Sequence, residues 1–328
     1  MNAELASVEL VWDWLDRLEF PISTATVEPS RAVGRALLFE FRAPHGLPQH
    51  HCAALSGHAV PARQTLGAGP YNPMPVQAAP VRAGAAIPPG TDAVLPDDAV
   101  ESGMAMEAVA PGEGVIGASS QLRKGELLFP AGHVLRPQDV AVLAEFGTPS
   151  LAVRCGLLAS GGVPVELDDL RHALLWRDLS QWDAEGEFVL TTTPLPSDRW
   201  DILAVAMRPA SGCRFGWRDT KPLICLPSDP LGFTLAHEMF TARLLRRTAG
   251  LPAAHRQATA KLSGKIVSSI GHTDLALVQM EGGVAEPLPF AEAGGAAGLA
   301  RADGFVIVPA MREGFPPGAL VTVQLLAP

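Results

Sequence analysis

The sequence predicts a multi-domain protein in which β-rich segments flank an α/β segment. Its 328 residues are more than one compact core usually organises, and 48% of them are hydrophobic, so several cores can form. The chain contains 32 Gly and 30 Pro, a content typical of turn-rich β architecture. Between residues 151 and 250, strand patterns alternate with helix patterns, which favours an α/β layer there.

The first 150 residues are predicted to form one helix, a β region and a second short helix. Pro21 should end the first helix, whose apolar face carries Val8, Val11, Trp12, Leu15 and Leu18 at helical spacing. Residues 33–128 are short extended runs between Pro and Gly, which predicts an all-β region. A short helix is expected over 137–146, and a domain boundary near Ser150.

The rest of the chain is predicted to form the α/β segment and then a small β domain. Strands are expected over 153–159, 188–192, 202–207 and 223–226, and helices over 168–179 and 230–247. After Pro252 the pattern returns to short strands, among them 305–308 and 319–326. The end of the chain is therefore predicted to be a separate β domain.

Charge and cysteine content exclude several classes of function. The net charge of −9 gives no general attraction to nucleic acid or to anionic membranes, so neither is an expected partner. The four Cys form no CxxC pair and are expected to be reduced thiols. No basic and apolar leader opens the sequence and no apolar run of about 18 residues occurs, so the protein is expected to be soluble and cytoplasmic.

Two short motifs resemble known sites but lack the required context. Gly112–Gly117 satisfies G-x-G-x-x-G, yet the residues after it have no helical apolar stripe, so a β loop is predicted and not a dinucleotide site. His237-Glu238 begins like a zinc-protease motif, but Thr241 stands where the second His would be. Neither motif predicts an active site.

A third group of residues has the chemistry of metal ligands but not the spacing. These residues are His45, His50, His51, Cys52 and His58. Imidazole and thiolate groups bind zinc and copper, but the spacing matches no closed tetrahedral site. We predict that this loop holds no tight structural metal, and a metal-binding function of the loop remains the weaker alternative.

Two loops that follow predicted strands are candidate ligand sites. In Pro227–Pro230, Asp229 can be the N-cap and Pro230 the first residue of the next helix. The same helix start could instead attract an anion. Likewise, the turn Ser160–Gly162 follows a strand and could approach a ligand at the carboxyl edge of a sheet.

Five segments, in order, resemble the MoeA and gephyrin E-domain family, the molybdopterin molybdenumtransferases. They are Pro44–Val60, Gly84–Val94, Lys124–Gly147, Met207–Pro230 and Arg301–Gly304. The first is similar to the family stretch ending Asn-Ser-Ala-Met-Asp-Gly-Tyr-Ala-Val, and the second to Gly-Ala-Pro-x-Pro-x-Gly-x-Asp-Ala-Val. The fourth is similar to the family's Met-Lys-Pro-Gly-Lys-Pro, Gly-Lys-Pro and Leu-Pro-Gly-Asn-Pro series. The resemblance covers nearly the whole chain.

The resemblance implies a four-domain fold. Residues 1–46 with 126–150 would form an elongated first domain, and 47–125 an inserted β domain. Residues 151–252 would form a small α/β domain like the family's molybdopterin-binding domain, and 253–328 a C-terminal β domain. The resemblance also implies a homodimer, and we expect a partner surface to cover Val8, Trp12 and Leu15.

The resemblance further implies a role in molybdenum cofactor biosynthesis or handling. Molybdopterin or its adenylylated form would be the ligand, molybdate and Mg would accompany it, and a molybdoenzyme would be the client. The expected ligand-binding residues are Ser160, Gly161, Thr192, Thr193, Lys221, Ser228 and Asp229.

Departures from the family pattern fall on its acidic positions and ligand loops. Ser56, Gln121 and Gly162 stand where the family has Asp. In the loops, 192–196 replaces Ser-Gly-Gly-Val-Ser and 227–230 replaces Pro-Gly-Asn-Pro, while the α/β domain is shorter by several tens of residues. Because carboxylates organise cations and handle protons, molybdate insertion is predicted to be altered or lost. The alternative is a non-catalytic dimeric scaffold or cofactor-delivery chaperone for a molybdoenzyme.

Overall fold

The computed structural model describes residues 5–252, 256–288 and 295–326, which divide into two compact units. The first unit holds the residues up to Leu38, Val134–Arg136 and the residues from Ser150 onward. Phe39–His133 and Pro137–Pro149 form the second unit. The second unit is thus inserted between segments of the first, and the finer division into four domains remains a prediction.

The second unit is built mainly from short antiparallel strands, as predicted for residues 33–128. Its two-stranded sheets pair β2 (Phe41–Arg42) with β11 (Leu127–Phe129) and β3 (Cys52–Ala53) with β10 (Val115–Ile116). Its three-stranded sheets are β6 (Ala79–Val81), β4 (Gly57–Val60) and β7 (Ala93–Leu95), and β5 (Met74–Pro75), β9 (Met104–Ala105) and β8 (Val100–Glu101). Because Gly112–Gly117 contains β10 and leads into turns, the predicted β loop is confirmed.

The second short helix is confirmed at the end of this unit. α2 (Pro137–Glu145) has Pro in its first position, where a missing N–H costs nothing. Leu143 is fully buried, and Gly147 has φ +62°, the left-handed conformation that commonly follows a helix.

The N-terminal helix packs on the first unit itself. α1 (Val8–Asp16) begins at Ser7, whose hydroxyl accepts a hydrogen bond from the Leu10 amide. Its apolar face is buried in the core of the same unit, and Arg247 donates hydrogen bonds to the carbonyls of Leu15 and Leu18. A partner subunit was expected to cover Val8, Trp12 and Leu15. For Val8 and Leu15 this is wrong, because the chain buries them itself, and Trp12 is partly buried against the same core.

The α/β part of the first unit contains a six-stranded mixed sheet. Its strand order is β14 (Gln181–Trp182), β13 (Leu158–Ser160), β15 (Phe188–Thr191), β19 (Lys221–Cys225), β18 (Arg214–Arg218) and β16 (Arg199–Ile202). The first four strands are parallel to one another, whereas β18 runs antiparallel to both of its neighbours. This arrangement confirms the predicted α/β layer.

Two predicted strands are each divided in the structure. Residues 153–159 form parts of β12 (Leu151–Arg154) and of β13, which belong to different sheets, because the chain leaves one pairing before it enters the next. β12 pairs with β1 (Thr24–Val27). Residues 202–207 are divided between β16 and β17 (Met207–Arg208), and the latter joins the C-terminal sheet.

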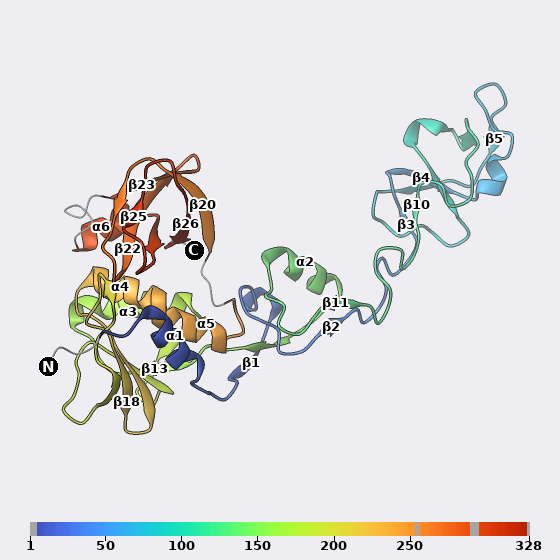
Figure 1. Ribbon diagram of the computed structural model, residues 1–328. Helices are drawn as coiled ribbons and strands as arrows, with labels where there is room; N and C mark the ends of the chain where they lie inside the picture. The colour runs from blue at the N-terminus through green and yellow to red at the C-terminus, as the bar shows by residue number, and fades with distance from the viewer. Residues whose placement is uncertain (1–4, 253–255, 289–294, 327–328) are drawn as a thin grey trace. The chain divides into compact units, whose positions relative to one another are not determined.

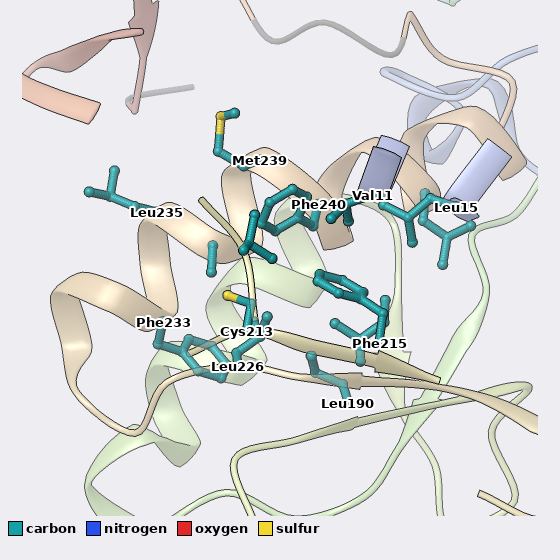
Figure 2. Packing of buried hydrophobic residues seen from close by; sticks show 14 of the residues in the cluster. Val11, Leu15, Leu190, Cys213, Phe215, Leu226, Phe233, Leu235, Met239 and Phe240 are labelled. Atoms are coloured by element: carbon teal, nitrogen blue, oxygen red, sulfur yellow. The ribbon is translucent and has the colours of Figure 1, made fainter. Parts of the chain in front are cut away.

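Helices cover one face of this sheet (Figure 1). α3 (Val165–Arg177) follows β13, and a continuous helix follows β19, made of α4 (Pro230–Ala236), a π-helical turn η4 (His237–Thr241) and α5 (Ala242–Thr248). Figure 2 shows Leu190 and Phe215 on the side of the sheet that meets Phe233 and Phe240. Because side chains alternate along a strand, Thr191 and Arg214 face the other way.

The C-terminal segment forms a β structure of its own, as predicted. The strands β22 (Thr273–Glu281), β23 (Val284–Pro287), β20 (Gln257–Leu262), β26 (Leu320–Leu325) and β24 (Gly304–Val308) pair in a closed ring, because β24 also pairs with β22. A separate pair joins β21 (Ile266–Val267) with β25 (Gly314–Phe315), and α6 (Gly295–Arg301) precedes β24. Within the described ranges, no helix is both long and apolar enough to cross a bilayer.

Candidate functional site

Three loops meet at the carboxyl edge of the α/β sheet. In the parallel register, Ser160 at the end of β13 lies opposite Val189, and Thr191 at the end of β15 lies opposite Cys225 at the end of β19. The loops after these strands therefore leave the sheet at the same edge. In open α/β sheets this is where ligands usually bind.

The turn after β13 is held rigidly by two side chains that sequence analysis did not single out. Gly161 has φ +102°, and a Cβ there would lie 2.6 Å from the Leu190 carbonyl oxygen, so only Gly fits. The Gly161 carbonyl accepts hydrogen bonds from Arg171 Nη1 at 3.1 Å and from Trp182 Nε1 at 2.8 Å. The Arg171 guanidinium also lies 5.4 Å from the centre of the Trp182 ring.

The turn after β15 is bonded directly to the turn after β13. Thr191 Oγ1 donates to the Gly162 carbonyl at 2.8 Å and accepts from the Thr193 amide at 3.1 Å. The Thr192 amide also donates to the Gly162 carbonyl, at 3.3 Å. Among the described residues, Thr192 Oγ1 has no hydrogen-bond partner although it is buried. These two loops therefore form one rigid edge with an unused hydroxyl.

Two other predicted residues at this edge already have structural roles. Ser160 is buried, and its hydroxyl donates to the Phe188 carbonyl at 3.0 Å. Asp229 caps α4, accepting from the Gly232 amide at 2.8 Å, so the predicted N-cap is confirmed. Ser228, beside it, is exposed. Of this set, Ser228, Thr192 and Thr193 are the hydroxyls that internal bonds do not occupy.

Lys221 does not lie with the other predicted residues. It is the first residue of β19, whereas the candidate edge is where that strand ends. At the start of β19, Lys221 lines a separate hollow of about 560 Å³ together with Trp14, Phe20 and Trp217. The structure thus brings together six of the seven expected ligand-binding residues and leaves Lys221 at the opposite end of the sheet.

One ion pair fixes the loop from β15 to β16. Arg218 donates to both oxygens of the Asp198 carboxylate at 2.7 and 2.9 Å, and to the Thr193 carbonyl at 3.4 Å. The hydrogen bonds from Arg218 hold the pKa of Asp198 below its ordinary value. Asp198 in turn accepts from the Leu195 amide at 2.7 Å, so this carboxylate is engaged inside the loop.

Arg171, like Arg218, forms an ion pair with an acidic side chain. Its Nη2 lies 2.5 Å from an oxygen of Asp168, on the first turn of α3. Burial lowers the pKa of Arg171, and the charge of Asp168 opposes that shift. Both Arg171 and Arg218 are therefore neutralised within the fold.

Of the three positions at which Asp was expected from the resemblance and is absent here, two lie in the second unit. Ser56 is exposed, and its hydroxyl accepts from the Ala83 amide at 3.1 Å. Gln121 is also exposed and lines a groove of about 640 Å³ formed by residues 119–126. Gly162 belongs to the first unit, and a Cβ there would meet open space. The Gly162 position could thus accommodate a carboxylate that the chain does not supply.

The His-rich loop shows no converging ligand set. Gln49 Nε2 contacts the His45 ring nitrogens, the closer at 2.8 Å, and the His45 ring packs edge-on against Phe146. Cys52 Sγ donates to the His50 carbonyl at 3.3 Å. Over residues 5–252, 256–288 and 295–326, no three His, Cys, Asp or Glu side chains converge in a way that could hold a metal ion.

His237 and Glu238 belong to a buried charge cluster and not to a zinc site. His237 Nε2 and Arg177 Nη2 each lie 2.9 Å from the same Asp178 oxygen. Arg177 Nη1 donates to Glu238 at 2.6 Å, and Arg246 lies 3.7 Å from the other Asp178 oxygen. The π-helical turn brings His237 and Glu238 to the end of α3. Sequence spacing could not predict this, because Asp178 is 59 residues from His237.

Comparison with known proteins identifies the family regions. Residues 6–147 match the model of the MoeA N-terminal region, domains I and II, and residues 259–326 match that of the MoeA C-terminal region, domain IV. Neither range includes residues 148–258, which carry the sheet edge described above.

Individual relatives cover all or most of the chain. A putative molybdopterin biosynthesis protein from Methanocaldococcus jannaschii is 23% identical over 99% of this chain and 97% of its own length. Molybdopterin molybdenumtransferase 2 from Mycobacterium tuberculosis is 22% identical, over 75% of this chain and 80% of its own. The first alignment spans 402 positions against 328 residues here, so that relative contains insertions.

Solved structures share the fold. A molybdopterin biosynthesis MoeA protein from Pyrococcus horikoshii superposes with a TM-score of 0.81 at 20% identity, covering 98% of this chain and 100% of that one. A molybdenum cofactor biosynthesis protein from Pyrococcus furiosus gives a TM-score of 0.69 at 16% identity, with the same coverage. The predicted multi-domain fold is confirmed.

Proposed function

Because the chain belongs to the MoeA family, we propose that it acts in molybdenum cofactor biosynthesis or handling by binding molybdopterin or its adenylylated form. The observation that carries this proposal is the convergence of three loops at the carboxyl edge of β13, β15 and β19. The names of the relatives support the ligand class, since they are described as molybdopterin biosynthesis and molybdenumtransferase proteins.

The edge offers neutral donors and a close backbone approach to a phosphate-bearing ligand. A Cβ at Gly162 would meet open space, so this Gly leaves the turn uncovered, and the neighbouring Gly161 carbonyl is already bonded inside the fold. The hydroxyls of Thr192, Thr193 and Ser228 can donate hydrogen bonds to phosphate oxygens. Thr192 Oγ1 is the strongest of these candidates, because burying a hydroxyl without a partner costs free energy that a bound ligand would recover.

We further propose that the chain does not insert molybdate by the usual route of the family. Ser56, Gln121 and Gly162 cannot carry negative charge at neutral pH, whereas a hard cation such as Mg²⁺ prefers carboxylate oxygens. Asp198 is bonded to Arg218, and Asp229 caps α4. Neither acid is thereby free to replace the missing groups.

The second candidate function is a dimeric scaffold or chaperone that delivers cofactor to a molybdoenzyme. It is favoured by the same observation, because an edge of hydroxyls and backbone groups can bind a ligand without acting on it. The two functions differ in product, since only a transferase releases molybdopterin that carries molybdenum.

The proposed ligand can be tested by mass spectrometry of small molecules that copurify with the native protein. We expect a pterin at near one equivalent per chain, and a clear reduction in Thr192→Val, which keeps the side-chain volume but removes the hydroxyl. Thr220→Val is the matched control, because Thr220 is exposed at the opposite end of β19. Native protein without any pterin, in cells that make molybdopterin, would contradict the proposal.

A further inference from the structure

Arg214 lies at the same sheet edge, although it belongs to a strand that runs the other way. It is the first residue of β18, and the antiparallel register places it opposite Cys225, the last residue of β19. The start of β18 and the ends of β13, β15 and β19 therefore form one continuous edge. Arg214 and Thr191 also share the face that points away from the helices, since Phe215 and Leu190 point toward them (Figure 2).

The guanidinium of Arg214 lacks the acidic partner that Arg171 and Arg218 have. Arg171 is paired with Asp168, and Arg218 with Asp198. Across the described parts of the chain, no carboxylate comes within 4 Å of Arg214, which is partly buried and packs 5.8 Å from the centre of the Trp200 ring. Its contact with Trp200 fixes the planar group in position without neutralising it.

The positive charge of Arg214 acts on the end of β19. Burial raises the pKa of the Cys225 thiol, and Arg214 opposes that shift. The charge of Arg214 therefore acts at the end of β19, where the charges of Asp198 and Arg218 also act.

We propose that Arg214 is the cation that binds a phosphate group of the ligand at this edge. A guanidinium presents two parallel N–H donors that match two phosphate oxygens, and Thr192 and Thr193, which follow β15 at the same edge of the sheet, can complete the contact. The inference rests on the proposed function in that it concerns the same edge, but it assigns the anionic group of the ligand to one side chain.

The chain contains a matched control for this residue. Arg199 begins β16, and its guanidinium lies 5.9 Å from the centre of the Trp217 ring, so it has the same cation–π arrangement. It lies opposite Trp217, toward the end of the sheet where β19 begins. Arg199 thus has the chemistry of Arg214 without its position.

The experiment is calorimetric titration of the full chain with inorganic pyrophosphate at low ionic strength. We expect Arg214→Gln to weaken binding about ten-fold or more, as for loss of a charged hydrogen bond, and Arg214→Lys to retain part of the affinity. Arg199→Gln should remain within about two-fold of the unmodified protein, because general screening of charge affects both sites alike.

Three results would each overturn the inference: no pyrophosphate binding by the unmodified protein, unchanged affinity in Arg214→Gln, or an equal loss in Arg199→Gln. Pyrophosphate contains no pterin, so this result is separate from the copurification test. If pyrophosphate binding depends on Arg214 but no pterin copurifies, the anion site stands and the proposed function fails. If a pterin copurifies and Arg214→Gln leaves pyrophosphate binding unchanged, the proposed function stands and the anion site fails.

Discussion

Replacing Asp178 with Asn should strongly destabilise the first unit. The Asp178 side chain is completely buried, and it accepts hydrogen bonds from His237 and Arg177, each at 2.9 Å. Asn is uncharged, so it cannot replace the negative carboxylate around which His237, Arg177 and the nearby Arg246 are packed. Breaking a buried ion pair by removing one partner typically costs about 3–5 kcal/mol.

Urea unfolding followed by tryptophan fluorescence measures this loss directly. All six Trp residues lie in the first unit, so the signal reports that unit alone. Asp16→Asn is the matched control, because Asp16 makes a partly exposed ion pair of 2.6 Å with Arg243 and should cost about 1 kcal/mol or less. A loss in Asp178→Asn no larger than that in Asp16→Asn would refute the reasoning.

The same carboxylate should make stability depend on pH in the acid range. Burial alone would raise the pKa of Asp178, but the hydrogen bond and charge of His237, together with Arg177, hold it well below its ordinary value of 3.8. The folded state therefore binds fewer protons than the unfolded state. The stabilisation that the Asp178 carboxylate contributes is complete above the ordinary pKa of 3.8, and it is lost as the pH falls toward the lower pKa of the folded state. In Asp178→Asn this part of the pH dependence should disappear.

Three further predictions concern the edge, the assembly and the His-rich loop. Gly161→Ala should lower the unfolding free energy by about 1–3 kcal/mol, because φ is +102° and the added Cβ would meet the Leu190 carbonyl. Gly162→Ala should cost much less, because a Cβ there meets open space. Equal losses in the two variants would contradict this prediction. Light scattering at micromolar concentration should give a dimer mass, and a monomer mass would remove that expectation. Metal analysis after dialysis should find well under one zinc or copper per chain. A stoichiometric metal lost on replacing His50 and His51 by Ala would overturn that.

Local patterns were sufficient to predict most elements of the fold. The apolar spacing of α1, the Pro and Gly that bound α2, and the Asp229 cap of α4 each act within a few residues of one another. The divided strands were missed for a different reason. Residues 153–159 and 202–207 are each extended, but tertiary pairing assigns their two ends to different sheets, which a local pattern does not contain.

The candidate site was predictable only in part. Ser160 and Ser228 follow predicted strands, which indicated loops that could approach a ligand at the carboxyl edge of a sheet, whereas Thr192 was expected there only from the resemblance. Lys221 was grouped with them by resemblance, although it begins its strand. Arg214 carried no sequence signal, because its significance depends on the antiparallel register that places it beside Cys225.

The central claim is that this MoeA-family chain binds its ligand but does not insert molybdate by the usual route. Complementation of a strain that lacks its own molybdenum-insertion enzyme, with molybdate kept low, tests this most directly. We predict little or no restored molybdoenzyme activity, because Ser56, Gln121 and Gly162 replace acids that would act together, and losing such groups typically costs several orders of magnitude in rate. Robust restoration by the unmodified protein would contradict the account.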